Sequence, residues 1–407
     1  MTAPDVRVSR WIAALAILYP AFVLYGSLIP FQVTPQPISA ALARFLATPL
    51  YELGAENRAD WVANGILFMP LAFVWCAWLT PRIGRAAGIA VLLTAAVFAV
   101  LLEFAQLWFA PRTVSLNDIF AEWVGTATGI VIWIVWGRAL LALASDVVRS
   151  GRRGIAAAAL LYVGAYLAFS FFPFDLVIGW GELRGKLASE NVAPVMSPGC
   201  GTTLRCAANL TFEVIAAAPL GVFVLLVARL RRVELGVLAA GAIGAAIGLG
   251  IELGQILVYS GMTQGISILT RGLGTALGVA AGQGWNSAAM TALRRNLRPT
   301  ILIAAAGYTL VVAAIMSEGS WQFAGALARL GETNWLPLYY HYYTTEQAAF
   351  VSLLANCALY APIGFGLWSW RQRIGPRAYD HGAGPGTSAA LAAIVAVVIE
   401  TSRLFKP

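Results

Sequence analysis

The sequence predicts an all-α fold: a polytopic membrane bundle of about eleven transmembrane helices in parallel four-helix repeats. Three observations predict it, namely an apolar composition, long apolar segments, and a motif set that recurs along the chain. Of the 407 residues, 59% are hydrophobic and 11% are charged, against about 45–50% and about 25% in soluble domains. The mean hydropathy is +0.76. This composition excludes a soluble enzyme domain, a disordered chain and a secreted disulfide scaffold.

Long apolar segments follow one another along the whole chain. A membrane-spanning helix needs about 20 mostly apolar residues. The segments that meet this requirement, in order, are residues 11–31, 61–80, 87–109, 118–143, 154–172, 209–228, 234–258, 266–284, 300–316, 348–368 and 386–404.

The connections between these segments alternate in charge. One set carries arginines, for example Arg82 and Arg85 or Arg231 and Arg232. The opposite set includes three long loops, near residues 32–60, 173–208 and 317–347, which carry acids. The positive-inside rule then places the N-terminus in the cytoplasm and the long loops in the periplasm of a bacterial inner membrane. The net charge of +8 therefore reports membrane topology, and the partner is the lipid bilayer, with no nucleic acid.

A motif recurs at a constant spacing of 149 residues. Its first copy contains Glu103, Gln106, Gly125 and Gly129. Its second copy contains Glu252, Gln255, Gly274 and Gly278. A third copy begins at Asn356 and Pro362 and stops at Pro407, which indicates a truncated chain or a decayed repeat. We expect units at 1–150, 151–298 and 299–407 with four, four and three spans. Because four spans return the chain to the side on which it started, successive units have the same orientation in the membrane.

These residues resemble the VanZ-like family. Its pattern joins an Asn and a Pro on one span, a Glu-x-x-Gln ending the next, an Arg, and an Asp-x3-Asn-x2-Gly-x3-Gly helix. The first unit matches at Asn64, Pro70, Glu103, Gln106, Arg112, Asp118, Gly125 and Gly129. It departs at Glu122, and the second unit departs at Gly261, Ser267 and Arg271. The resemblance implies a cell-envelope membrane protein with a link to glycopeptide (antibiotic) resistance, and it implies no particular reaction.

The polar residues of the first unit are expected at one membrane depth. Glu103 and Gln106 are three residues apart and share a helix face. With the helix ending at Phe109, Glu103 would lie about 9 Å below the outer end. Asp118, Glu122 and the two glycines of the unit form one stripe on the next helix.

Two interpretations of this cluster stay open. In the first it is a periplasm-facing pocket, in which Glu103 and Asp118 act as acid and base. The ligand-binding residues would be Asn64, Gln106, Arg112 and Glu122. In the second, the same side chains only hydrogen-bond neighbouring helices together, which is favoured for Glu252. The glycines at 125, 129, 274 and 278 are interpreted as helix-packing residues.

Three function classes follow. The leading hypothesis is a cell-envelope protein that binds a lipid-linked glycan or an anionic lipid without necessarily transforming it. The others are a hydrolase or transferase acting on a lipid-linked envelope precursor, and a transporter. We expect no cofactor and no metal, because two His and four Cys have no zinc or haem spacing. Cys200 and Cys206 are close enough in one outer loop to form a disulfide.

Overall fold

The computed structural model describes residues 6–284 except 150, 194 and 196–202, and beyond them short stretches, of which 334–344 and 385–402 are the longest. The chain divides into two units, Met1–Gln283 and Gly284–Pro407. In the second unit the described elements include a short helical turn, η3 (Tyr339–Tyr343), and the helix α14 (Pro385–Ser402).

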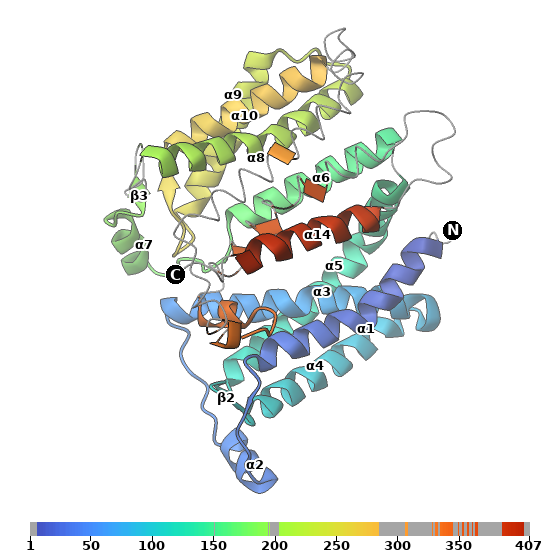
Figure 1. The fold of residues 1–407 in the computed structure, drawn as a ribbon, viewed down its shortest axis with the longest axis vertical. Helices are drawn as coiled ribbons and strands as arrows, with labels where there is room; N and C mark the ends of the chain where they lie inside the picture. The colour runs from blue at the N-terminus through green and yellow to red at the C-terminus, as the bar shows by residue number, and fades with distance from the viewer. Residues whose placement is uncertain are drawn as a thin grey trace. The chain divides into compact units, whose positions relative to one another are not determined.

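The first unit begins with four long helices (Figure 1). They are α1 (Val6–Leu28), α3 (Arg58–Ile83), α4 (Ala86–Gln106) and α5 (Leu116–Arg149). The connection after α1 contains the short helix α2 (Ile38–Leu46) and a 3-10 turn, η1 (Ala55–Asn57). It also contains β1 (Gln32–Val33), which pairs antiparallel with β2 (Phe109–Ala110) after α4. The loops that follow α1 and α4 are thereby joined at one end of the bundle.

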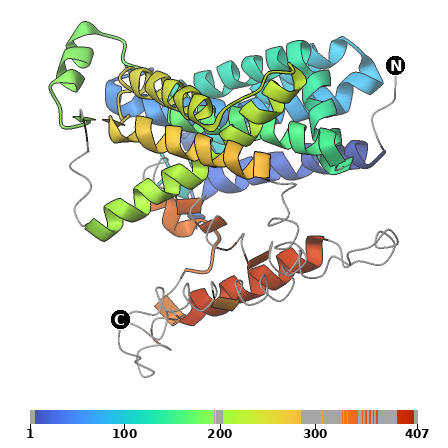
Figure 2. The same cartoon turned by 90° about the horizontal axis from the view of Figure 1, so that it is seen from above.

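Four long helices, again with a short helix and a strand between the first and second, follow in the next part of this unit, but here the short helix precedes the strand. Its helices are α6 (Gly151–Ser170), α7 (Trp180–Leu187), α8 (Thr203–Leu230), α9 (Val237–Gln255) and α10 (Ile266–Gln283). Here β3 (Val192–Ala193) pairs parallel with β4 (Thr263–Gln264). Figures 1 and 2 show α8, α9 and α10 side by side.

Seven helices within the described residues are long and apolar enough to cross a membrane: α1, α3, α4, α5, α6, α8 and α9. They coincide with the first seven expected segments, so the chain is a multi-pass membrane protein. The expected span 266–284 is the helix α10, which is not among these seven. The last expected span falls on α14, whose apolar part Ala390–Ile399 is shorter than a span. The expected spans 300–316 and 348–368 fall largely outside the described residues.

Small residues bring the helices of each pair close together. A Cβ atom on Gly125 of α5 would lie 1.9 Å from the backbone oxygen of Gly65 in α3. A Cβ on Gly278 of α10 would lie 1.9 Å from the backbone oxygen of Ala218 in α8. Only glycine permits backbones to approach this closely. The glycines therefore set the distance between α3 and α5 and between α8 and α10.

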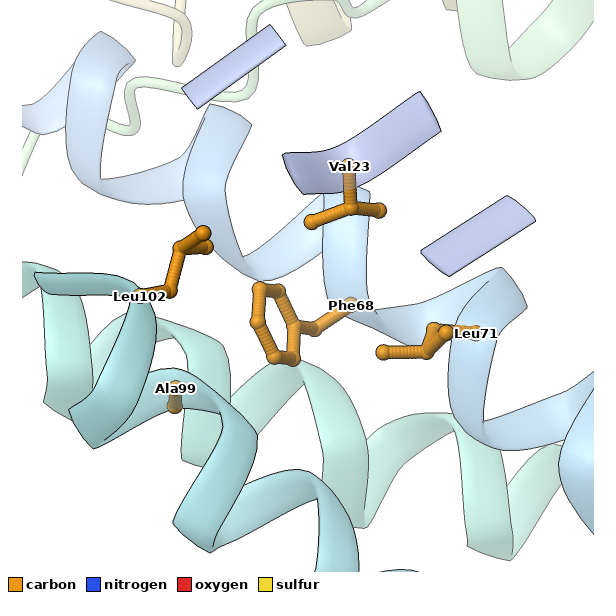
Figure 3. Close-up of a cluster of buried hydrophobic side chains, with 5 residues drawn as sticks. All are labelled: Val23, Phe68, Leu71, Ala99 and Leu102. Carbon is orange, nitrogen blue, oxygen red and sulfur yellow. The ribbon is translucent and has the colours of Figure 1, made fainter. Parts of the chain in front are cut away.

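The apolar core next to these helices is built from α1, α3 and α4. Val23, Phe68, Leu71, Ala99 and Leu102 are buried in one cluster (Figure 3). Leu102 immediately precedes the polar residue Glu103, so the core ends where the polar cluster begins.

The end of α4 differs from the expected one. The helix stops at Gln106, because the following residues turn and then enter β2. Glu103 consequently lies one turn from the helix end, about 4.5 Å at 1.5 Å per residue, rather than the expected 9 Å. The polar residues therefore lie closer to the bundle end than the apolar pattern predicted.

Candidate functional site

The polar cluster of the first four-helix segment lies where α4 ends and α5 begins. Glu103 is in the last turn of α4, and its Oε2 accepts a hydrogen bond of 3.0 Å from the backbone N–H of Ser115. The Ser115 hydroxyl in turn accepts the N–H of Asn117 at 3.2 Å, which covers a free donor at the start of α5. Glu103 thus ties the end of one helix to the beginning of the next.

Three polar side chains form the buried floor of the cluster. Glu103 and Glu122 are each 2% exposed and Gln106 is 7% exposed. Gln106 hydrogen-bonds the Glu103 carboxyl. The Glu122 carboxyl lies within electrostatic range of Glu103 and Asp118, and its Oε2 has no hydrogen-bond partner.

Three further side chains of the cluster, called its rim here, are half-buried: Asn64, Arg112 and Asp118. Asn64 of α3 hydrogen-bonds the Asp118 carboxyl in the first turn of α5. A carboxylate in the first helical turn is also favoured by the partial positive charge of the helix N-terminus. In the rim, the Asp118 carboxyl thus has a hydrogen-bonding amide and, within electrostatic range, the guanidinium of Arg112.

Arg112 has a second role at this rim. Its Nε donates to the carbonyl of Ile29 at 2.7 Å, and its Nη2 donates to the carbonyl of Gly26 at 2.5 Å. Its charge is also within electrostatic range of Glu103 and Asp118. The guanidinium thus binds the α4–α5 loop to the end of α1 while it faces the acids. The structure brings together all six predicted catalytic and ligand-binding residues.

A family model described as VanZ/LLP1 matches residues 11–137. The match covers most of α1, all of α3 and α4, the first two-thirds of α5, and every residue of the cluster. Residues 11–137 are a VanZ-like segment. Comparisons with curated proteins and with solved structures gave no match.

Beyond the VanZ-like segment, α8, α9 and α10 hold a second polar cluster, 149 residues further along the chain. Oε2 of Glu252 accepts the backbone N–H of Gln264 at 2.7 Å, as Glu103 accepts that of Ser115. Glu213 stands where Asn64 does, and it accepts hydrogen bonds from Ser267 at 3.0 Å and Thr270 at 2.6 Å.

The two clusters differ in their charges. In the second, Arg271 forms a buried ion pair with Glu252, and its Nε donates to the Tyr166 hydroxyl at 3.1 Å. Arg271 stands 149 residues after Glu122, so a cation occupies the position that holds an acid in the VanZ-like segment. Sequence reasoning noted the replacement but missed the ion pair. The constant spacing, applied to Glu122 and Arg271, was the signal that pointed to it.

Sequence reasoning also missed Lys186 of α7. This side chain is 5% exposed. Its Nζ donates to four carbonyl oxygens at the end of α9 and just after it, those of Gln255, Val258, Tyr259 and Gly261. A cation at a helix C-terminus is favoured by the free carbonyl groups there. Burial lowers the pKa of Lys186.

An ion pair joins α3 to the outer part of the next segment. Arg58 lies 2.7 Å from Oε1 of Glu182 in α7 and donates to its Oε2 at 2.9 Å. The guanidinium, followed by the backbone N–H of Ile178, lowers the pKa of Glu182 to about 2. The VanZ-like segment is therefore joined by charge to the loop that follows α6.

The side chains that could bind a metal or form a disulfide bear on two further expectations from the sequence. Across the part of the chain that the structure describes, no group of three or more His, Cys, Asp or Glu side chains is arranged to hold a metal ion. Cys206 is disulfide-bonded, and Cys200, its expected partner, lies outside the described residues.

Proposed function

We propose that the protein is a bacterial inner-membrane protein of the cell envelope, and that the cluster in its VanZ-like segment binds a lipid-linked, glycan-related or anionic ligand. One observation carries the proposal: half-buried Arg112 and Asp118 lie within electrostatic range of each other and of the buried Glu103. An arginine suits phosphate or carboxylate groups, and buried acids among membrane helices are rarely kept without a role.

We propose further that the chain is built from repeated four-helix units, of which the VanZ-like segment is the first. The support is that equivalent contacts recur 149 residues apart. Gly125 faces the backbone oxygen of Gly65, and Gly274 faces that of Val214. The arrangement of four, four and three spans extends this proposal to the C-terminal part.

The proposed orientation places the N-terminus in the cytoplasm and the α7 loop in the periplasm. It rests on the arginines of the opposite connections. Alkaline phosphatase, which is active only in the periplasm, should be active when fused after Ala188 and inactive when fused after Arg232. The reverse pattern would refute the orientation.

Ligand binding is tested by purifying the full chain with membrane lipids and measuring retained lipid by native mass spectrometry. Asp118→Asn should lose a retained phospholipid or lipid-linked glycan and keep the thermal stability of the wild type. Asp146→Asn makes the same chemical change at the other end of α5, where no cluster residue lies, and should retain the ligand. Equal retention by both variants would refute the proposal.

An enzymatic role is the second candidate, favoured by the proximity of Glu103 and Asp118. A hydrolase or transferase would need one of them to donate a proton and the other to accept one. Incubation with a lipid-linked pyrophosphate, followed by mass spectrometry of the products, distinguishes the two roles. Turnover that disappears in Glu103→Gln, with ligand retention unchanged, would establish the enzyme.

A further inference from the structure

A buried acid with one carboxyl oxygen that has no hydrogen-bond partner lies in the floor of the VanZ-like cluster. Glu122 is 2% exposed, and its Oε2 has no hydrogen-bond partner. The neighbouring Glu103 is equally buried. Two buried carboxylates repel each other, and removing each charge from water costs several kcal/mol. The pair therefore requires a positive charge of its own.

The second cluster shows what this positive charge does. There Glu252 is held by a backbone N–H in the same way as Glu103, and the guanidinium of Arg271 compensates its charge. In the VanZ-like segment the equivalent position holds Glu122 in place of the cation. The fold thus has a place for one positive charge beside this glutamate, and the VanZ-like segment fills that place with a second acid.

The other charged groups named around the pair are mostly acidic. The charge of Asp118 in α5 acts on Glu122, and the charge of Asp60 in α3 acts on Asp118. Arg112 is within electrostatic range of Glu103, yet two of its N–H groups are bound to carbonyls of α1. Of the charged groups named here, four are acids and one is an arginine, and α1 contributes backbone carbonyl oxygens, which also favour a positive charge.

We propose that Glu103 and Glu122 form a proton-binding site, in which one of the two carboxyl groups is protonated at neutral pH. A proton is the cation that fits, because no metal-holding group occurs among the described residues. One turn beyond Glu122, α3 and α5 approach each other closely at Gly65 and Gly125. The site gives the proposed function a neutral hydrogen-bond donor beneath Arg112 and Asp118.

Infrared spectroscopy of the full-length protein in lipid nanodiscs tests this site directly. A protonated carboxyl group has a C=O stretching band that a carboxylate lacks. The wild type at neutral pH should show this band. Glu122→Arg copies the second cluster and should lose it, and Arg271→Glu copies the first cluster and should strengthen it. Asp146→Asn serves as the control that leaves the band unchanged.

A carbodiimide that reacts with protonated carboxyl groups in apolar surroundings provides a measurement on the unmodified protein. Peptide mass spectrometry should find the label on Glu103 or Glu122 and not on Glu252, which is buried to a similar degree but ion-paired. This internal control needs no variant to fold.

Three results would overturn the proposal: no protonated band in the wild type, a band unchanged in Glu122→Arg, or equal labelling of Glu252. The first would mean that the pair is ionised and holds another cation. Because these measurements report protonation and not ligand retention, the proton site and the proposed function fail independently.

Discussion

The close approach of α3 and α5 makes Gly125→Ala the most informative single substitution. Its new Cβ would lie 1.9 Å from the backbone oxygen of Gly65, and real Cβ contacts are essentially never under 3.0 Å. To restore a contact of 3.0 Å from 1.9 Å, the two helices must separate by at least 1.1 Å. A backbone oxygen cannot rotate away as a side chain can. Overpacking of this kind costs about 3 kcal/mol, against a gain of about 1 kcal/mol in helix propensity.

Thermal unfolding in detergent, followed by tryptophan fluorescence, measures the net loss of about 2 kcal/mol. The matched control is Gly88→Ala in α4, whose Cβ would meet only Cγ2 of Ile130 at 3.6 Å, an ordinary contact. The control should unfold at the wild-type temperature or higher, and Gly125→Ala several degrees lower. Equal unfolding temperatures for the two variants would refute the packing of α3 against α5.

Three further predictions concern charged side chains, and thermal unfolding of each variant checks them. Lys186→Met removes the ammonium from four buried or partly buried carbonyl oxygens and should cost about 3 kcal/mol. Glu252→Gln leaves Arg271 buried without its partner and should cost about 3–5 kcal/mol, which Glu252→Met combined with Arg271→Leu should largely restore. Arg58 lowers the folded-state pKa of Glu182 from 4.5 to about 2. Their pair therefore stabilises the fold fully above pH 4.5, and the advantage of wild type over Glu182→Gln should disappear as the pH falls through about 2.

The helices could be predicted well from the apolar pattern, because a membrane helix satisfies its own backbone and needs only length and apolarity. The end of α4 could not, since Leu107 and Trp108 are apolar and extend the pattern. What stops the helix there is the pairing of β2 with β1, in which Phe109 lies opposite Val33, 76 residues earlier in the chain. A contact between residues so far apart in the sequence cannot be predicted from the local pattern of apolar residues.

The sequence predicted which residues lie together in the polar cluster, but only some of the contacts between them. Helical spacing placed Glu103 with Gln106, and Asp118 with Glu122, on common faces. Spacing within a helix says nothing about which side chain of another helix is met. The engagement of Arg112 by the carbonyls of α1, and the lack of a partner for Oε2 of Glu122, therefore emerged only from the structure.

By itself, the sequence determined that this chain crosses a membrane several times and that polar residues gather in its VanZ-like segment, because hydropathy and helical periodicity are local properties. Tertiary structure alone decided how charges are compensated. Arg271 is compensated by Glu252 and Lys186 by carbonyl oxygens, whereas Oε2 of Glu122 has no hydrogen-bond partner. The physical reason is that the energy of a buried charge depends on the atoms within a few ångströms of it, and in this protein those atoms come from other helices.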